Sequence, residues 1–205
     1  MLRGTVFDPE HRTISQAVQE RFGFAEMRLV SFADLYAGKI AAALDRQHPR
    51  DLFDVHFLLA AEGISDDLFR AFLVYLVSHP RPAHELLCPH LLDIAAQYDE
   101  QFVGMTVDTI ALDVLLDARQ RLINEIGSRA RSDSVREFLI RFHSLEPDFE
   151  AIDLPPSLVD LPAVRWKLLN LNRLRRENST KFDEQLSALS ACLADISPPT
   201  EPASA

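Results

Sequence analysis

Residues 39–59 read KIAAALDRQHPRDLFDVHFLL, and His48-Pro49 interrupts this stretch near its middle. Apolar residues recur at helical spacing on both sides of His48-Pro49. Pro49 suits the first turn of a helix, because its missing N–H would have no partner there. Gly63 is a favourable residue for a helix end. The stretch therefore predicts two helices joined by a sharp turn, the second from about Pro49 to Ala61.

Five charged residues are concentrated in the same stretch. Lys39 and Arg46 lie seven positions apart, on one helical face. On the second helix, Arg50 and Asp54 form an i,i+4 pair and Asp51 precedes Asp54 by three positions. We expect these residues to converge on one concave polar seam, with hydrogen bonds from the arginines to the aspartates. Such a seam could hold a polyphosphate, with the aspartates orienting the arginines or helping with a metal ion.

An ordinary structural role also fits this spacing, and spacing alone favours it. Carboxylates in a first helical turn gain about 0.3–1 kcal/mol each from the helix dipole. A surface pair such as Arg50–Asp54 contributes about 0.3–0.5 kcal/mol. Gly38 costs up to about 1 kcal/mol relative to alanine in a helix interior, which is easier to understand if something approaches the backbone closely there.

The rest of the chain predicts a mostly α protein, a helical bundle that follows a small β element. Short strands are expected at residues 2–7 and 27–31, with a weak helix around residues 15–21 between them. Further helices are expected near residues 65–78, 91–102, 106–130, 133–143, 161–177 and 181–194. We divide the chain into a β part (1–31), a helical region (32–143), C-terminal helices (144–195) and a disordered tail (196–205).

Composition limits the class of protein. The 205 residues are 47% hydrophobic and 25% charged, which is typical of a globular protein with a core. The net charge of −10 disfavours nucleic-acid binding over the whole surface but permits local basic patches. Cys88 and Cys192 are the only cysteines, which argues against a disulfide framework and suits the cytoplasm. No apolar run approaches the roughly 18 residues of a membrane span.

Two other clusters of polar residues stand out in the sequence. His79, His84, Cys88 and His90 do not follow the compact spacing of zinc sites, so we expect no metal there. The densest basic run could contact an RNA backbone, or it could be a solvated helix face opposite Trp166 and Leu169. Its members are Arg165, Lys167, Arg173, Arg175, Arg176 and Lys181.

The stretch SFADLYAGKIAAALDRQHPRDLFDVHFLL resembles the AbiEii/AbiGii toxin family of nucleotidyltransferases. The shared pattern is a K-[LI]-x-A-x-x-x-R helix followed at once by an R-D-x-[FY]-D helix. AFLVYLVSHPRP, FVGMT and LPAVRWKLLNL are similar to the family as well. The resemblance implies a toxin of a bacterial toxin–antitoxin or abortive-infection system, usually of type IV. It also implies that the protein uses a nucleoside triphosphate and Mg²⁺ as cofactors. The implied partners are an RNA acceptor, expected to be tRNA, and a cognate antitoxin.

Carried over by position, the resemblance implies that Lys39, Arg46 and Arg50 bind the nucleotide, and that Asp51 and Asp54 complete the catalytic site. The family's Gly-Ser and Asp-x-Asp motif, whose carboxylates hold Mg²⁺, is not found in this chain. We therefore expect a family member without its metal-binding N-terminal part, nearly silent in catalysis and prone to self-association through unpaired strand edges. The alternative is a non-catalytic helical module that binds an antitoxin or a nucleotide.

Overall fold

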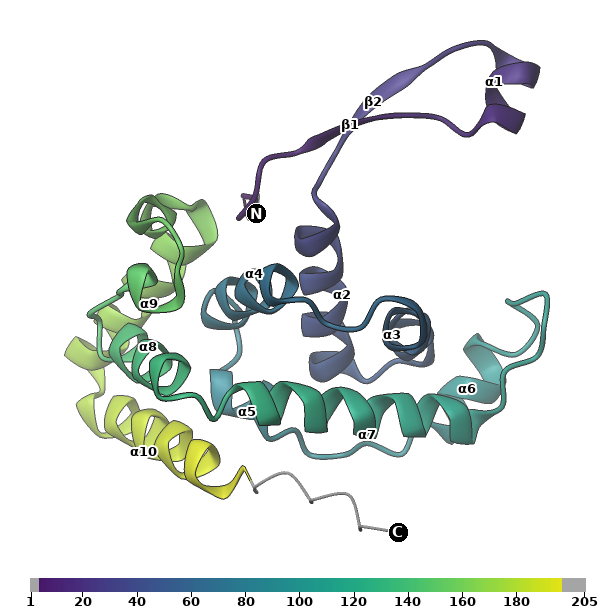
Figure 1. The fold of residues 1–205 in the computed structure, drawn as a ribbon. Coiled ribbons are helices and arrows are strands. Elements are labelled where there is room, and N and C mark those ends of the chain that lie inside the picture. Colours follow the sequence, from purple (N-terminus) through teal and green to yellow (C-terminus); the bar gives the residue numbers. More distant parts are fainter. Residues whose placement is uncertain (1–3, 197–205) are drawn as a thin grey trace, which may run out of the picture.

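The computed structural model describes residues 4–196 of the chain. In this part, helices dominate and the only sheet has two strands (Figure 1). The mostly α fold class predicted from the sequence is confirmed. The disordered tail expected at 196–205 lies outside the described residues from 197 onward, so it stays a prediction.

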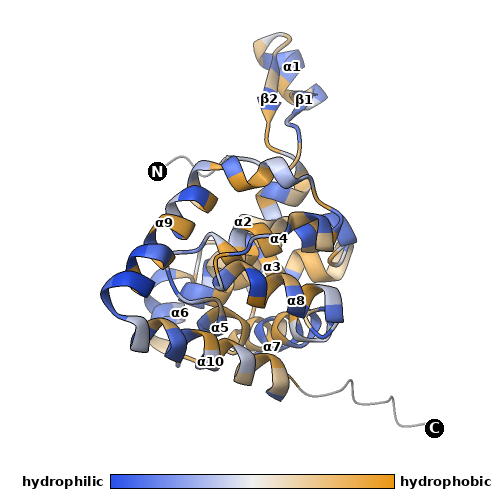
Figure 2. Ribbon diagram, turned by 90° about the vertical axis from the view of Figure 1, so that its left-hand side faces the viewer, coloured by the Kyte–Doolittle hydropathy of each residue, from blue (hydrophilic) through white to orange (hydrophobic). Residues whose placement is uncertain are grey.

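A hairpin opens the described chain. Strand β1 (Glu10–Thr13) pairs antiparallel with β2 (Glu26–Leu29), and helix α1 (Gln16–Phe22) lies in the connection between them. The hairpin and α1 stand clear of the helical body, as Figures 1 and 2 show. Strand β2 overlaps the strand predicted at residues 27–31, whereas β1 was not predicted.

The predicted strand at residues 2–7 is wrong in its described part, because residues 4–7 are not a strand. The backbone N–H groups of Val6 and Phe7 donate to the two carboxylate oxygens of Asp34, at 2.8 and 3.0 Å. Asp34 lies in the first turn of α2 and is 2% exposed. Backbone donors that a sheet would need are thus bonded to a helix, and the first strand begins only after Pro9.

Helix α2 (Phe32–Arg46) is the centre of the body. Its residues Ala37, Ile40 and Leu44 are at most 2% exposed. It packs against α3 (Pro49–Ala61) and α4 (Asp66–Val77), and α3 packs in turn on α7 (Leu112–Arg129). The close approach that Gly38 permits is made by the Tyr75 ring of α4, 3.4 Å from the position of an added Cβ. Helix packing is therefore sufficient to explain this glycine.

A second group of helices completes the body. Helix α8 (Asp133–His143), α9 (Pro162–Glu177) and α10 (Ser179–Asp195) pack together, with two 3-10 turns at Phe149–Ile152 and Pro156–Asp160. The short helices α5 (Ala83–Leu87) and α6 (Ala95–Gln101) follow α4 in the chain and precede α7. Helix α5 contacts both α10 and α7, whereas α6 contacts α3. No helix among the described residues is long and apolar enough to cross a membrane.

A disulfide joins Cys88, at the end of α5, to Cys192 in α10, with an S–S distance of 2.07 Å. This corrects the expectation from the cysteine count. The two residues are 104 positions apart, and only the packing of α10 against α5 brings them together.

Candidate functional site

The turn between α2 and α3 is fixed by a buried glutamine. Gln47 ends α2 in the left-handed region, with φ of 52°, and is 3% exposed. Its side-chain amide donates to the carbonyl oxygen of His90 at 2.7 Å, and its Oε1 accepts from the backbone N–H of Leu92 and from Arg119 Nη1, both at 3.0 Å. His48 then caps α3 by accepting the Arg50 N–H at Nδ1. The charged residues on either side of this turn are therefore held on a rigid frame.

Two ion pairs cross from α2 to α3. Arg46 binds Asp51 through two hydrogen bonds, Nε to Oδ2 at 3.1 Å and Nη2 to Oδ1 at 2.7 Å. Lys39 Nζ donates to Asp54 Oδ2. About a third of each side chain in the second pair is exposed, whereas the Arg46 side chain is 61% exposed. The predicted linkage of cations on one helix to carboxylates on the next is thus present.

Arg50 departs from the expected arrangement. Its Nη2 donates at 3.2 Å to the backbone carbonyl of Gln101, the last residue of α6 (Ala95–Gln101). Asp54 is already bonded to Lys39, so the predicted Arg50–Asp54 pair does not form. None of the five charged residues lines the cavities of about 780, 580 and 360 Å³ found elsewhere in the described chain. The arrangement is an exposed polar seam rather than an enclosed pocket.

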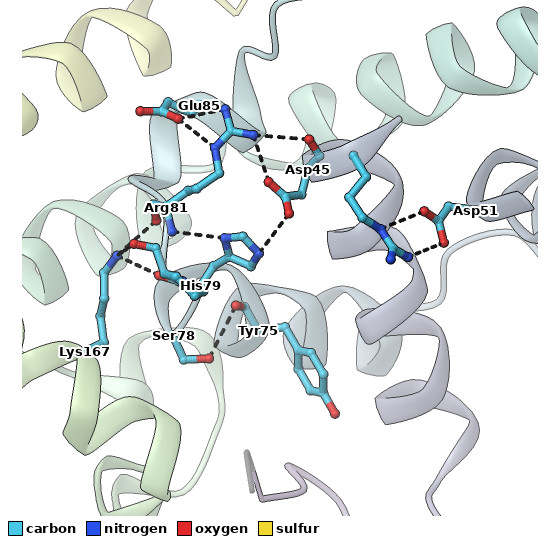
Figure 3. A network of polar contacts seen from close by, with 10 residues as sticks. Asp45, Asp51, Tyr75, Ser78, His79, Arg81, Glu85 and Lys167 are labelled. Carbon is cyan, nitrogen blue, oxygen red and sulfur yellow. Dashed lines mark hydrogen bonds and ion pairs between the residues drawn. The ribbon is translucent and has the colours of Figure 1, made fainter. Parts of the chain in front are cut away.

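A second network supports α2 from the opposite direction (Figure 3). Asp45, next to Arg46, accepts from Arg81 Nη1 at 2.8 Å, and its carboxylate also lies 3.7 Å from His79 Nε2. Arg81 also donates from Nε to Glu85 at 2.7 Å. The hydrogen bond to Asp45, and after it the one to Glu85, raises the pKa of the Arg81 guanidinium above its ordinary value. Asp45 and Arg81 were missed in the sequence because they are 36 positions apart and no spacing rule connects them.

Lys167 does not belong with the exposed members of the basic run. It is 5% exposed, and its Nζ donates to the carbonyl oxygens of His79 at 2.7 Å, Pro80 at 3.4 Å and Arg81 at 3.0 Å. Burial lowers the pKa of its ammonium to about 8. The expectation that Lys167 contacts RNA is therefore wrong, because its ammonium is buried and holds the turn after α4. It shares the buried face of α9 with Val164 and Leu171, a helical spacing that could have indicated this.

The other members of the run lie on the surface of α9 and the start of α10. Arg165, Arg173, Arg175, Arg176 and Lys181 are exposed. Arg173 is bound to Glu177 at 2.9 Å, and Arg175 lies over the Phe182 ring at 5.9 Å. Arg165 and Arg176 make no ion pair within the described chain. The exposed members remain available to a polyanion.

A Mg²⁺ site does not fit the residues at the seam. Such a site needs carboxylate oxygens that are free to bind the metal, together with waters or phosphates. Asp51 instead accepts two hydrogen bonds from a guanidinium, and Asp54 holds an ammonium whose charge would repel a cation. Among residues 4–196, no group of three or more His, Cys, Asp or Glu side chains could hold a metal ion. The carboxylates of the seam are therefore occupied by cations of α2.

The histidine and cysteine residues around 79–90 have other contacts. His79 faces Asp45, Cys88 is in the disulfide, and the His90 carbonyl binds Gln47. His84 is partly buried, and burial lowers the pKa of its imidazole. Each of these residues therefore serves the packing of the loop between α4 and α6.

Comparison with protein families gives one match, to the family described as nucleotidyl transferase AbiEii toxin, type IV TA system, over residues 1–170. The match contains α2, α3, the 79–81 turn and most of α9. Comparison with curated proteins and with solved structures gives no match. Since the family match extends over most of the 205 residues, the chain belongs to the AbiEii family of nucleotidyltransferase toxins of type IV toxin–antitoxin systems.

Proposed function

We propose that this chain provides the triphosphate-binding and RNA-binding parts of a toxin that transfers nucleotides from a nucleoside triphosphate to tRNA. The observation that carries this proposal is the row of cations at the α2–α3 turn, inside the region that matches the family. Lys39, Arg46 and Arg50 would contact the triphosphate. Arg46 and Arg50 are exposed, so a polyanion can reach them without unfolding the turn.

Asp51 and Asp54 would act as positioning residues. Each holds a cation of the α2 helix in place by a charge-assisted hydrogen bond. An exposed ion pair contributes only about 0.2–1 kcal/mol, so a triphosphate with several negative oxygens can compete with a single carboxylate for Arg46. The aspartates thereby keep the cations pre-oriented without blocking the ligand.

The exposed arginines of α9 would bind the tRNA acceptor. The same protein would meet a cognate antitoxin and would act in the cytoplasm, where its substrates are, as part of an abortive response to phage. In a reducing cytoplasm, Cys88 and Cys192 would be thiols, and they would pair only under oxidising conditions. The open strand edges support self-association.

A second candidate function is a helical module that binds nucleotide or antitoxin without catalysis. The engagement of both aspartates by cations favours it. Incubation with α-labelled nucleoside triphosphates, Mg²⁺ and bulk tRNA tests both proposals. Retention of tRNA separates them, because the first requires the chain to bind nucleotide and tRNA, whereas the second requires only nucleotide or antitoxin. We expect this chain alone to retain nucleotide and tRNA without transfer. Rapid transfer by the chain alone would contradict the assignment of Asp51 and Asp54 as partners of the cations.

The RNA-binding part is tested by salt dependence. Each phosphate contact contributes about −0.7 to −0.9 to the slope of log affinity against log salt. Replacing Arg165, Arg175 and Arg176 together with glutamine should therefore reduce the slope for tRNA by about 2–3. Replacement of three scattered arginines, Arg12, Arg70 and Arg136, is the control of equal charge. If both sets reduce the slope equally, only net charge matters and α9 is not the RNA surface.

A further inference from the structure

The hairpin at the start of the chain presents an unusual exposed surface. Phe24 is 72% exposed, Met27 53% and Val30 45%, on or beside β2. Within the described residues β2 pairs only with β1, so its outer edge is open. A two-stranded hairpin is marginally stable in water, and an open edge is a template for one more strand.

The hydrogen-bond pattern shows which backbone groups of β2 point outward. The N–H of Ile14 donates to the carbonyl of Ala25 at 3.1 Å, directly across the ladder. Backbone groups alternate between the two edges of an antiparallel strand. The backbone N–H and C=O groups of Ala25, Met27 and Leu29 therefore point toward β1. Those of Glu26 and Arg28 point to the open edge.

The charge pattern of this edge is complementary to itself. If a second copy of β2 pairs antiparallel about an axis at Met27, Glu26 lies opposite Arg28 of the second copy, and Arg28 opposite its Glu26. Glu26 and Arg28 are also the residues whose backbone groups point outward. The register that allows backbone hydrogen bonds between the two copies therefore also pairs opposite charges. Moving the axis to Glu26 or to Arg28 would oppose two glutamates or two arginines, which is destabilising.

The same register covers the exposed apolar residues. Phe24 then lies opposite Val30 of the second copy, and Met27 opposite Met27. The β1 edge offers less, because Glu10 and Arg12 are already bonded to each other, with Nε to Oε2 at 2.9 Å. Glu26 has only a loose contact with His11, 3.7 Å away, and Arg28 makes no ion pair in the described chain. Their charges are free for another strand.

We propose that two copies of this chain pair through β2 in the register centred on Met27. The product is a four-stranded antiparallel sheet in a dimer with two-fold symmetry, closed so that the same surface is used on both sides. The hairpin projects from the helical body, which leaves room for the second body (Figure 2). The proposal does not rest on nucleotide transfer or on any role of the α2–α3 seam.

Charge exchange between Glu26 and Arg28 tests this register in the full chain. Sedimentation equilibrium should show a dimer for the unchanged protein. Glu26→Arg and Arg28→Glu should each weaken the dimer by at least about tenfold, since each variant opposes like charges at two symmetric places. The double variant E26R/R28E should dimerise like the unchanged protein. An equimolar mixture of the two single variants should also form dimers, since one then offers two positive charges and the other two negative.

Circular dichroism establishes that each variant is folded, and Arg12→Glu on the β1 edge is the control that should leave the dimer intact. A monomeric unchanged protein at every concentration would overturn the proposal. So would a dimer indifferent to both single substitutions, or a folded double variant that stays monomeric. If the edge binds a different partner instead of a second copy, the double variant E26R/R28E would not recover the binding. That result would also overturn the proposal.

Discussion

At the α2–α3 turn, each charged side chain of α2 binds a partner on another element. Lys39 and Arg46 bind carboxylates of α3, and Asp45 binds Arg81 beyond α4. The Arg46 guanidinium is mostly exposed, so its pair with Asp51 is screened by water and salt. The contact that holds Arg46 is therefore weak.

His143 leads to a prediction on acid stability. It is 7% exposed, and burial, aided by the positive charge of Lys167, lowers the pKa of its imidazole to about 4. The unfolded histidine takes up a proton below about 6.5, whereas the folded one does so only near its lowered pKa. Unfolding therefore binds a proton in this window, and stability should fall by about 3 kcal/mol as the pH falls through it.

Urea denaturation of the unchanged protein and of His143→Leu between pH 7 and pH 4 measures this contribution. The variant should show a shallower loss of unfolding free energy across this range. His90→Ala, at an exposed histidine, is the control and should keep the steep loss. Equal pH dependence in the His143 variant and the unchanged protein would show that another group carries the effect.

At the scale of elements, the sequence was most informative where local chemistry sets a boundary. Pro49 at the first turn places the start of α3, and the predicted range Pro49–Ala61 matches the structure. The start of α7 was expected at 106 but lies at Leu112, and α5 was missed inside a proline-rich stretch. β1 reads EHRT, with no apolar alternation to reveal it. Boundaries that depend on distant contacts were not readable.

The candidate site shows the same division. Lys39, Arg46, Asp51 and Asp54 were found because helical spacing brings them to adjoining faces. The predicted partner of Arg50, Asp54, was wrong, because Arg50 instead binds the Gln101 carbonyl, 51 positions away. The charge of Lys167 predicts a surface position, whereas its helical spacing from Val164 and Leu171 agrees with the buried position that it has. Partners far apart in sequence need the packed structure.

The disulfide between the end of α5 and α10 predicts a redox effect on stability. It closes a long loop, since the cysteines are 104 positions apart, and a crosslink of this kind typically contributes about 2–4 kcal/mol. Denaturant unfolding with and without dithiothreitol should differ by that amount. The double variant C88S/C192S should be insensitive to the reductant. An unchanged protein insensitive to reductant would show that the bond does not form in solution.

At the scale of the whole molecule, the helical body carries both candidate ligand surfaces. The α2–α3 seam and α9 are connected through the 79–81 turn, which Lys167 holds from one side and Asp45 contacts from the other (Figure 3). The hairpin is separate from this body (Figure 1). The division of the chain at residues 31 and 143 stays a prediction.

The proposed binding of a triphosphate at the α2–α3 seam can be measured directly. Calorimetric titration of the full chain with ATP, GTP, CTP and UTP should detect binding of at least one of them. Lys39→Met, Arg46→Met and Arg50→Met should each weaken it by about 10–100-fold, the loss expected for a charged hydrogen bond. Arg70→Met is the control. Arg70 lies on α4, away from the seam, and pairs with Asp67 and Asp153, so its loss should change the affinity less than about twofold. No binding by the unchanged chain, or equal losses of affinity for Arg46→Met and Arg70→Met, would contradict triphosphate binding at this seam.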